Sequence, residues 1–417
     1  MSIQDFKSAY KTIMDDHFPE TMEIAFGTGE QRQTLCYEKA AWEIEGVRKG
    51  LRYGENPGQE AALYKLVNGN LVLGGVECVQ PGRHLASNIE LLQSGKHPGK
   101  TNITDADNAL NILRYLTDRP CVVIVKHNNP CGVARADSLA EAYRKANLAD
   151  RVAAFGGAIA LNREVDRATA ELILQHYAEV VVAPEFAEGV MDLFAKKKNL
   201  RVMRVARMSG LHEFDGARFV DFKSLVDGGI IAQLSFMAEA LENADYKLAA
   251  SEYQGKAYKI NRPPTERELE DLKFGWLLEA GVTSNSVLYV KNGVSVGIGT
   301  GEQDRVGVAQ IARDKAYRKL EDRYCFERYG VGFNDLDDVD KKKEIEAAVA
   351  AEKGGLIGSA MVSDAFFPFR DGIDVGLREG VSAVVQPGGS LNDYQSIEAC
   401  NEHDATMVFT GQRSFKH

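Results

Sequence analysis

The sequence lacks the patterns that mark metal-binding, disulfide-rich, membrane and nucleic-acid-binding proteins. Its six cysteines are scattered over 417 residues and none form a C-x-x-C pair, so zinc spacing is absent and the reduced thiols of a cytoplasmic protein are expected. No apolar run approaches the ~20 residues of a membrane span, and the mixed-charge N-terminus is not typical of a secretory signal. A net charge of −10 argues against nucleic-acid binding. We therefore expect neither a membrane nor a nucleic-acid partner.

The remaining composition is that of an ordinary globular protein, and the order of its strand-like and helical segments follows an α/β pattern. Apolar residues make up 44% and charged residues 26% of the chain, which is long enough for two or three domains. Strand-like segments such as 179–184 alternate with helical patterns such as 138–149 and 265–278. This alternation predicts a mostly parallel sheet. Residues 1–20 are expected to form a short helix, and Asn68-Gly69 to form a two-residue hairpin turn.

The stretch Cys121–Gly132, CVVIVKHNNPCG, combines a buried strand with chemically active side chains. Its four apolar residues Val122–Val125 are too few for a helix and indicate a fully buried strand, and the later proline and glycine predict a turn. Lys126 and His127 would then lie at the carboxyl end of a strand, the sheet edge where ligands bind. Histidine can move a proton near neutral pH and lysine supplies a cation. The alternative is a strand whose polar end reaches solvent.

Three further motifs are compatible with ligand binding. Gly156-Gly157 interrupts AAFGGAIAL and indicates a bulge or a close backbone approach. The turn containing Gly299 and Gly301 could cradle an anion, but it is not a P-loop because no lysine with Ser or Thr follows. The segment 363–374, SDAFFPFRDGID, places three phenylalanines beside charges. It predicts either a site for a flat heteroaromatic ring or a core plug under a loop.

Nine motifs, taken together, connect the chain with one enzyme family. In chain order they are LRYGENPGQ, TNITDADNA, VKHNNPCG, AAFGGAIAL, EVVVAP with AKKKN, SNSVLYVKNG with GIGTGEQDR, SDAFFPFRDGID, QPGGS and RSFKH. The set resembles the formyltransferase portion of the bifunctional purine-biosynthesis enzyme, aminoimidazole carboxamide ribonucleotide (AICAR) transformylase. The resemblance covers roughly residues 51–417.

The resemblance implies an α/β fold of two cytidine-deaminase-like α/β/α domains, related by duplication and preceded by a short helical N-terminal extension. The implied boundaries are 1–50 for the extension, 51–225 for the first domain and 226–417 for the second, with a charged helical insertion near 314–358. It also implies a cytoplasmic homodimer whose active sites lie at the subunit interface.

The resemblance also implies the residues of the site. Lys126 and His127 match the catalytic pair. Substrate-binding positions are matched by Arg52, Tyr53, Asn102, Gly157, Asn285, Arg305, Phe366, Asp371, Arg413 and His417. Among these, the positions around the nucleotide phosphate are Arg52, Tyr53 and Arg413, and those that contact the carboxamide are Asn102 and Asn285. Ser286 and Asp364 match a site for a monovalent cation such as K⁺, and no zinc is expected.

The implied reaction is transfer of a formyl group from 10-formyltetrahydrofolate to the 5-amino group of AICAR, a late step of inosinate (IMP) synthesis. The amine is a weak nucleophile and must lose a proton, which a neutral His127 can accept. Lys126 can stabilise the tetrahedral oxyanion or protonate the departing folate nitrogen. The residue types at 126 and 127 therefore suit this chemistry.

The chain departs from the family pattern in three places. Gly58 stands where the family usually has histidine, and a lysine-rich approach to the Ser-Asn motif is replaced by Ala280-Gly281-Val282-Thr283. Only 50 residues precede LRYG, where the bifunctional enzyme carries its cyclohydrolase. We therefore expect a stand-alone transformylase, with ring closure carried out by a separate protein.

Three alternatives compete with this interpretation. A zinc deaminase needs a Pro-Cys-x-x-Cys motif, but position 134, three residues after Cys131, is alanine. A non-catalytic nucleotide- or folate-binding regulator would have the same pockets without turnover. A third possibility is a protein that also performs ring closure without the usual domain.

Overall fold

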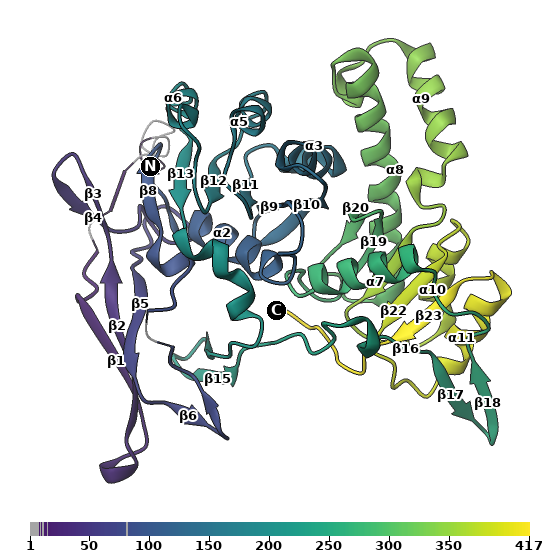
Figure 1. The fold of residues 1–417 in the computed structure, drawn as a ribbon, viewed down its shortest axis with the longest axis horizontal. Helices are drawn as coiled ribbons and strands as arrows, with labels where there is room; N and C mark the ends of the chain where they lie inside the picture. Colours follow the sequence, from purple (N-terminus) through teal and green to yellow (C-terminus); the bar gives the residue numbers. More distant parts are fainter. Residues whose placement is uncertain (1–7, 9, 11, 15, 81) are drawn as a thin grey trace. The chain divides into compact units, whose positions relative to one another are not determined.

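The computed structural model describes residues 8, 10, 12–14, 16–80 and 82–417. The chain divides into two compact units, each made of two segments (Figure 1). Unit 1 is Met1–Leu110 with Ala158–Met237, and unit 2 is Asn111–Gly157 with Ala238–His417. Both units contain strands and helices, so the predicted α/β class is confirmed. The domain boundaries at residues 50 and 225, which rest on the resemblance, stay a prediction.

Unit 1 combines small antiparallel sheets with one mixed sheet. Its elements, in chain order, are β1 (Thr21–Phe26), β2 (Gln33–Ala40), β3 (Trp42–Ile44), β4 (Val47–Lys49), β5 (Leu63–Gly69), β6 (Val72–Leu73), β7 (Val76–Glu77), β8 (Glu90–Gln93), most of α2 (Lys100–Leu113), β11 (Ala158–Leu161), α5 (Arg167–Ile173), β12 (Val180–Ala183), α6 (Val190–Phe194), β13 (Arg201–Arg204), β14 (Val220–Ser224) and β15 (Ile230–Leu234). Strands β11, β12 and β13 are parallel neighbours, and β8 pairs antiparallel with β13.

The expected helical extension is wrong over residues 21–49, which form strands β1 to β4. TMEIAF and QTLCYEKA alternate in side-chain type with the period of two that suits a strand, and they pair antiparallel from Thr21↔Glu38 to Phe26↔Gln33. Much of the helix expected over residues 1–20 lies outside the described residues, and residues 16–19 are irregular.

The expected hairpin turn at Asn68-Gly69 is also wrong, because both residues belong to β5 and pair with β2. A Cβ atom on Gly69 would lie 2.3 Å from the backbone oxygen of Thr34. Glycine is required here for a close approach between strands, not for a turn.

Unit 2 contains the larger group of strands and the long helices. Its elements, in chain order, are β9 (Cys121–Lys126), β10 (Asn129–Arg135), α3 (Leu139–Ala149), α4 (Arg151–Ala154), β16 (Lys247–Leu248), β17 (Ala250–Tyr253), β18 (Lys256–Lys259), α7 (Glu266–Glu279), β19 (Val287–Lys291), β20 (Val294–Gly299), α8 (Arg305–Tyr329), α9 (Val339–Ala351), β21 (Ala360–Ser363), α10 (Arg370–Leu377), β22 (Ala383–Gln386), α11 (Asp393–Glu402) and β23 (Thr406–Phe409).

The sheet of unit 2 is mixed, so the expectation of a mostly parallel sheet is wrong. Its strand order is β16-β23-β22-β21-β19-β20-β10-β9, and only β21, β22 and β23 run parallel to one another. The two hairpins β9–β10 and β19–β20 pair antiparallel along the centre of this order. Short two-residue connections force neighbouring strands to be antiparallel, whereas a parallel pair needs a long crossover.

Local signals define the ends of the main helices in unit 2. Asp304 caps α8 by accepting a hydrogen bond from the backbone N–H of Gly307, and Gly330 ends the helix in the left-handed conformation. The charged segment expected to be a helical insertion near 314–358 contains α9, which packs on α8 through Ile345 and Val349 (Figure 1). Across the described part of the chain, no helix is both long and apolar enough to span a membrane.

A partly buried ion pair fixes the start of α7. Arg262 donates two hydrogen bonds of 2.9 Å to the Glu268 carboxylate, which also accepts from the Thr265 backbone N–H at 2.8 Å. Burial alone would raise the pKa of Glu268, but the hydrogen bonds from Arg262 and Thr265 outweigh it and lower the pKa to about 2. Because this value lies below the ordinary 4.5, the stabilisation is present above pH 4.5 and is lost as pH falls toward 2.

Glu268→Gln is therefore expected to destabilise the protein at pH 7 by roughly 1.5–3 kcal/mol, the range for hydrogen bonds to a charged group. The difference from wild type should shrink as pH falls through the window between 4.5 and about 2. Urea unfolding at a series of pH values measures both effects. A stability difference that does not change with pH would contradict the assignment, and Glu239→Gln, at an exposed glutamate, serves as the control.

Candidate functional site

The predicted pair Lys126 and His127 lies at a tight hairpin turn. Strand β9 ends at Lys126, which pairs with Asn129 at the start of β10. His127 and Asn128 form the two-residue connection, with φ angles of 54° and 61°. Positive φ at both central positions is the pattern of the turn that matches strand twist, and asparagine tolerates it well. Left-handed backbone at a histidine is uncommon and is often found at functional sites.

The turn lies earlier in the sequence than predicted. Pro130 and Gly132, expected to form it, are part of β10, where the pairing register shifts between them. Gly132 serves helix packing, since a Cβ atom there would lie 1.9 Å from the backbone oxygen of Ala146 in α3. The prediction that Lys126 and His127 follow a buried strand is confirmed, because residues 121–125 are fully buried.

The two side chains of the pair differ in how they are held. The Lys126 ammonium donates a 2.7 Å hydrogen bond to the Phe155 carbonyl. His127 is exposed and, within the described part of the chain, forms no hydrogen bond or ion pair. Lysine carries three donors, so two remain available on Lys126. The pair thus consists of an oriented cation and a free imidazole.

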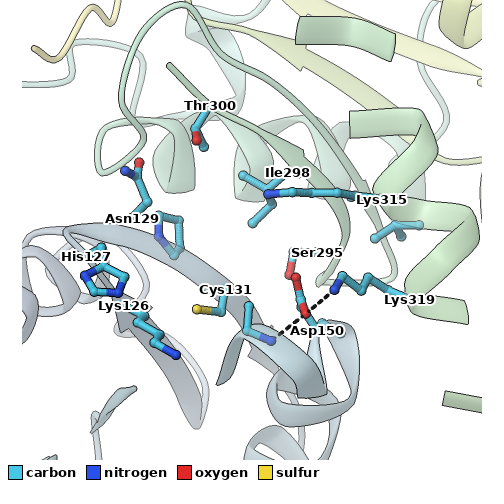
Figure 2. A pocket seen from close by; sticks show the side chains of 15 residues that line it. Lys126, His127, Asn129, Cys131, Asp150, Ser295, Ile298, Thr300, Lys315 and Lys319 are labelled. Carbon is cyan, nitrogen blue, oxygen red and sulfur yellow. Dashed lines mark hydrogen bonds and ion pairs between the residues drawn. The ribbon is translucent and has the colours of Figure 1, made fainter. Parts of the chain in front are cut away.

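A cavity of about 410 Å³ opens beside the pair within unit 2 (Figure 2). This volume lies in the range of small-molecule sites. Its lining comes from the hairpin turn and β10, the junction of α3 and α4, strand β20 and helix α8. The lining residues are Lys126, His127, Asn129, Pro130, Cys131, Ala149, Asp150, Ala153, Ser295, Val296, Gly297, Ile298, Thr300, Lys315 and Lys319.

The cavity contains more positive than negative groups. Asp150 caps α4 through the Ala153 backbone N–H and forms a 2.9 Å ion pair with Lys319. Lys315 reaches into the cavity from the preceding turn of α8 (Figure 2). Burial lowers the pKa of the Lys315 ammonium, and Asp150 opposes that effect. Neither lysine was predicted to belong to the site, because in the sequence both are ordinary charges of a polar helix.

A second group of predicted residues meets in a buried network around Asp364. The Asp364 carboxylate forms an ion pair with Arg305, accepts from the Ser284 hydroxyl, and accepts from the Ser286 backbone N–H at 3.2 Å. Arg305 also donates at 2.9 Å to the side-chain oxygen of Asn285. The structure therefore brings Asn285, Ser286, Arg305 and Asp364 together in one network.

Glu279, which the sequence analysis missed, completes this network. It is fully buried and accepts a hydrogen bond from the Ser286 hydroxyl, while its Oε2 has no partner within the described part of the chain. Burial raises the pKa of Glu279 well above its ordinary value, and the nearby Asp364 carboxylate acts in the same direction. Oxygen ligands of this kind suit a hard cation. Ser286, Asp364 and Glu279 are the residues that would hold one.

The C-terminal segment packs against the same network and against the turn. The Ser414 backbone N–H donates to the Asp364 carbonyl at 2.9 Å. Lys416 donates to the backbone oxygens of Asn128 and Gly281, at 3.2 and 3.1 Å. Arg413 stacks over the Phe415 ring, which contacts the His417 ring edge-on at 5.7 Å. The predicted residues Arg413 and His417 thus belong to a segment anchored beside the turn.

In the aromatic segment 363–374 the structure shows a core plug, and the alternative of a site for a flat heteroaromatic ring stays a prediction. Phe367 is fully buried in the core of unit 2, whereas Phe366 is half-buried and Phe369 is 57% exposed. Asp371 lies in the first turn of α10, next to Gly372. The packing of α10 against the Phe367 ring requires glycine at 372, since a Cβ there would lie 2.8 Å from that ring.

The remaining predicted residues, Arg52, Tyr53 and Asn102, lie in unit 1. Arg52 is 7% exposed, donates to the Tyr53 hydroxyl at 2.9 Å and to the Lys96 carbonyl at 3.1 Å, and has no partner for its Nε among the described residues. Asn102 is in the first turn of α2. Its side chain accepts from the Gly99 N–H at 3.1 Å.

Two charged residues of unit 1 that the sequence analysis missed accompany Asn102. The Glu179 carboxylate accepts from the Asn102 amide at 3.4 Å and from Arg201 at 3.3 Å. Arg201 is almost completely buried, and burial lowers the pKa of its guanidinium. The available sequence signal was a charged residue at the start of each of two buried strands, with Glu179 directly before β12 and Arg201 as the first residue of β13.

Comparison with known proteins places this chain in a family. The family model described as the AICARFT/IMPCHase bienzyme matches residues 6–315. The chain belongs to this family. Proteins named bifunctional purine biosynthesis protein PurH are 35% identical over 374 residues in Caldicellulosiruptor saccharolyticus, 38% over 371 in Magnetococcus marinus and 39% over 369 in Chlorobaculum parvum.

These similarities cover most of this chain but only part of each relative. The matches span 90%, 88% and 88% of the chain, and 60%, 59% and 59% of the respective relatives. The chain therefore spans about six-tenths of the length of these bifunctional relatives. Family membership agrees with the resemblance found from the motifs.

The predicted site residue Gly157 has a packing role that can be tested. A Cβ atom there would lie 3.1 Å from the Val125 carbonyl and 3.2 Å from the Ala154 carbonyl, next to the strand end that carries Lys126. Gly157→Ala should destabilise the protein by about 1–3 kcal/mol, as overpacking typically does. Calorimetric unfolding measures this. Gly216→Ala, at a site with no atom within 4 Å, is the matched control, and equal melting temperatures for both variants would refute the packing role.

Proposed function

We propose that the protein transfers a formyl group from 10-formyltetrahydrofolate to the 5-amino group of AICAR, producing formyl-AICAR and tetrahydrofolate in purine biosynthesis. The observation that carries the proposal is the pair Lys126 and His127, an oriented ammonium beside an unpartnered imidazole at the edge of a 410 Å³ cavity. Membership of the AICARFT/IMPCHase bienzyme family and the similarity to PurH proteins support it.

The pair supplies both proton-transfer roles that the reaction needs. As the AICAR amine attacks the formyl carbon, a neutral His127 takes the amine proton. The resulting tetrahedral carbon carries an oxyanion, which the Lys126 ammonium stabilises with a donor that Phe155 does not use. The bond from that carbon to the folate nitrogen then breaks, and the nitrogen leaves with a proton from Lys126 or from the protonated His127. Atoms and charge balance without a further reactant.

The other groups bind and orient the substrates in this proposal. Arg52, Tyr53 and Arg413 bind the nucleotide phosphate, because guanidinium forms charge-assisted hydrogen bonds with phosphate oxygens. Asn102 and Asn285 contact the carboxamide, and Gly157, Phe366, Asp371 and His417 complete the binding surface. Ser286 and Asp364, with Glu279, hold a monovalent cation such as K⁺. We further propose a homodimer with active sites at the subunit interface, on the basis of the resemblance.

His127→Ala and Lys126→Ala are expected to lower kcat by ~10²–10⁴-fold, because general acid–base catalysis contributes about that much. AICAR affinity should change little, since neither residue is assigned to the phosphate. The assay combines purified protein, AICAR and 10-formyltetrahydrofolate, and quantifies both formyl-AICAR and inosinate. Inosinate as a product would show cyclohydrolase activity as well, and a wild-type protein that binds both substrates without turnover would identify a regulator.

Each catalytic variant has a matched control in the same unit. His403 is an exposed histidine at the end of α11. Lys291 ends β19 and donates to the Ile357 carbonyl at 2.8 Å, as Lys126 does to that of Phe155. His403→Ala and Lys291→Ala should retain wild-type turnover. Near wild-type rates in the Lys126 and His127 variants would remove this pair from the mechanism.

Arg52→Ala should weaken AICAR binding by roughly 10–150-fold, because a hydrogen bond to a charged group contributes about 1.5–3 kcal/mol. Binding of the nucleoside that lacks the phosphate should be unaffected, and so should folate binding. Isothermal calorimetry measures all three affinities. Arg207→Ala removes an exposed arginine of unit 1 as the control. Equal losses for nucleotide and nucleoside would show that Arg52 does not bind the phosphate.

A further inference from the structure

Lys315 stands out among the cavity residues because its charge is not balanced locally. Its neighbour Lys319 pairs with Asp150, but the Lys315 ammonium forms no hydrogen bond or ion pair with any described residue. Figure 2 shows its side chain extending from α8 toward the middle of the lining residues. Its nitrogen is therefore presented to whatever enters the cavity.

The surroundings of Lys315 do not replace the water that it loses. The half-buried side chain lies near the positive charges of Lys319 and the exposed Arg318, while Asp150 is already paired with Lys319. Cys131 also faces it. The lining contains three lysines, at 126, 315 and 319, and a single carboxylate. A partly desolvated ammonium without a counter-charge is unfavourable unless an anion binds to it.

We propose that Lys315 anchors an anion-binding subsite that takes an oxyanion of one of the two substrates. This inference rests on the proposed function. The donor carries negative charge on its glutamate tail and the acceptor on its phosphate. The tail carboxylate is the favoured ligand, because Arg52 and Arg413 are already assigned to the phosphate and an ammonium suits a single carboxylate as a compact charge. Lys126 and His127 border the same cavity, so a donor bound there would present its formyl group to them.

The test compares Lys315→Met with wild type on three substrate pairs. The first contains AICAR and 10-formyltetrahydrofolate, the second replaces the donor by its derivative with both glutamate carboxylates converted to amides, and the third replaces AICAR by its nucleoside. Lys315→Met should raise the KM of the natural donor roughly 10–150-fold, the range for a charged hydrogen bond, with kcat nearly unchanged. With the amide donor, the variant and wild type should have equal KM values.

The controls separate the charge of Lys315 from general effects on the helix. Arg318→Met removes an exposed positive charge from the next turn of α8. It should leave the KM of the natural donor and the KM of AICAR unchanged. Lys315→Arg should restore most of the donor affinity, and thermal unfolding verifies that each variant folds. Lys315→Gln serves as a second neutral variant if the methionine variant does not fold.

The outcomes of these assays test the Lys315 subsite separately from the proposed function. A KM effect that disappears with the nucleoside, and not with the amide donor, would establish the subsite with phosphate as its ligand. KM losses that are the same for all three pairs, or absent, overturn the subsite. Wild-type turnover decides the proposed function independently. If there is no turnover, calorimetric binding of tetrahydrofolate and its diamide to wild type and Lys315→Met still decides the subsite.

Discussion

The buried ion pair between Arg305 and Asp364 organises much of unit 2. Asp364 follows β21 and Arg305 begins α8, so the pair joins the end of a strand to the start of the longest helix described. Arg305 orients the Asn285 side chain, and the Asp364 carbonyl holds the C-terminal segment through Ser414. Removing one member of a buried pair leaves an unpaired charge, typically a loss of several kcal/mol. Loop, helix and C-terminal segment therefore depend on one another.

The hairpin turn shows how a strained backbone can present a reactive side chain. A two-residue connection between antiparallel strands forces positive φ, which asparagine tolerates and most residues other than glycine rarely adopt. The related hairpin at residues 292–293 uses Asn-Gly, the usual solution. Histidine at the first position of the turn projects an exposed imidazole from a fully buried strand, so its position is fixed although its surroundings are open.

Much of the site could be predicted because its residues follow strong local patterns. Val122–Val125 is a run that only a buried strand explains, and the lysine and histidine after it must lie at the strand end. Thr265 and Glu268 form the capping box that starts α7 at the predicted residue. The wrong turn predictions arose where glycine is required for close packing. Gly69 and Gly132 looked like turn signals, but each allows a close approach to a backbone oxygen contributed by a distant part of the chain.

The sequence by itself determined the α/β class, the family, most of the helices and the position of Lys126 and His127 at the end of a buried strand, because these depend on local periodicity and on motifs of adjacent residues. Only the tertiary structure decided the mixed strand order, the strands at 21–49 and the partners of charged side chains. Nothing local distinguishes Lys315, which faces a cavity unpaired, from Lys319, which pairs with Asp150. The same holds for Glu279, whose burial against Ser286 results from the way α7 packs on β19. Burial and pairing depend on which distant segments meet, and that is a property of the folded chain.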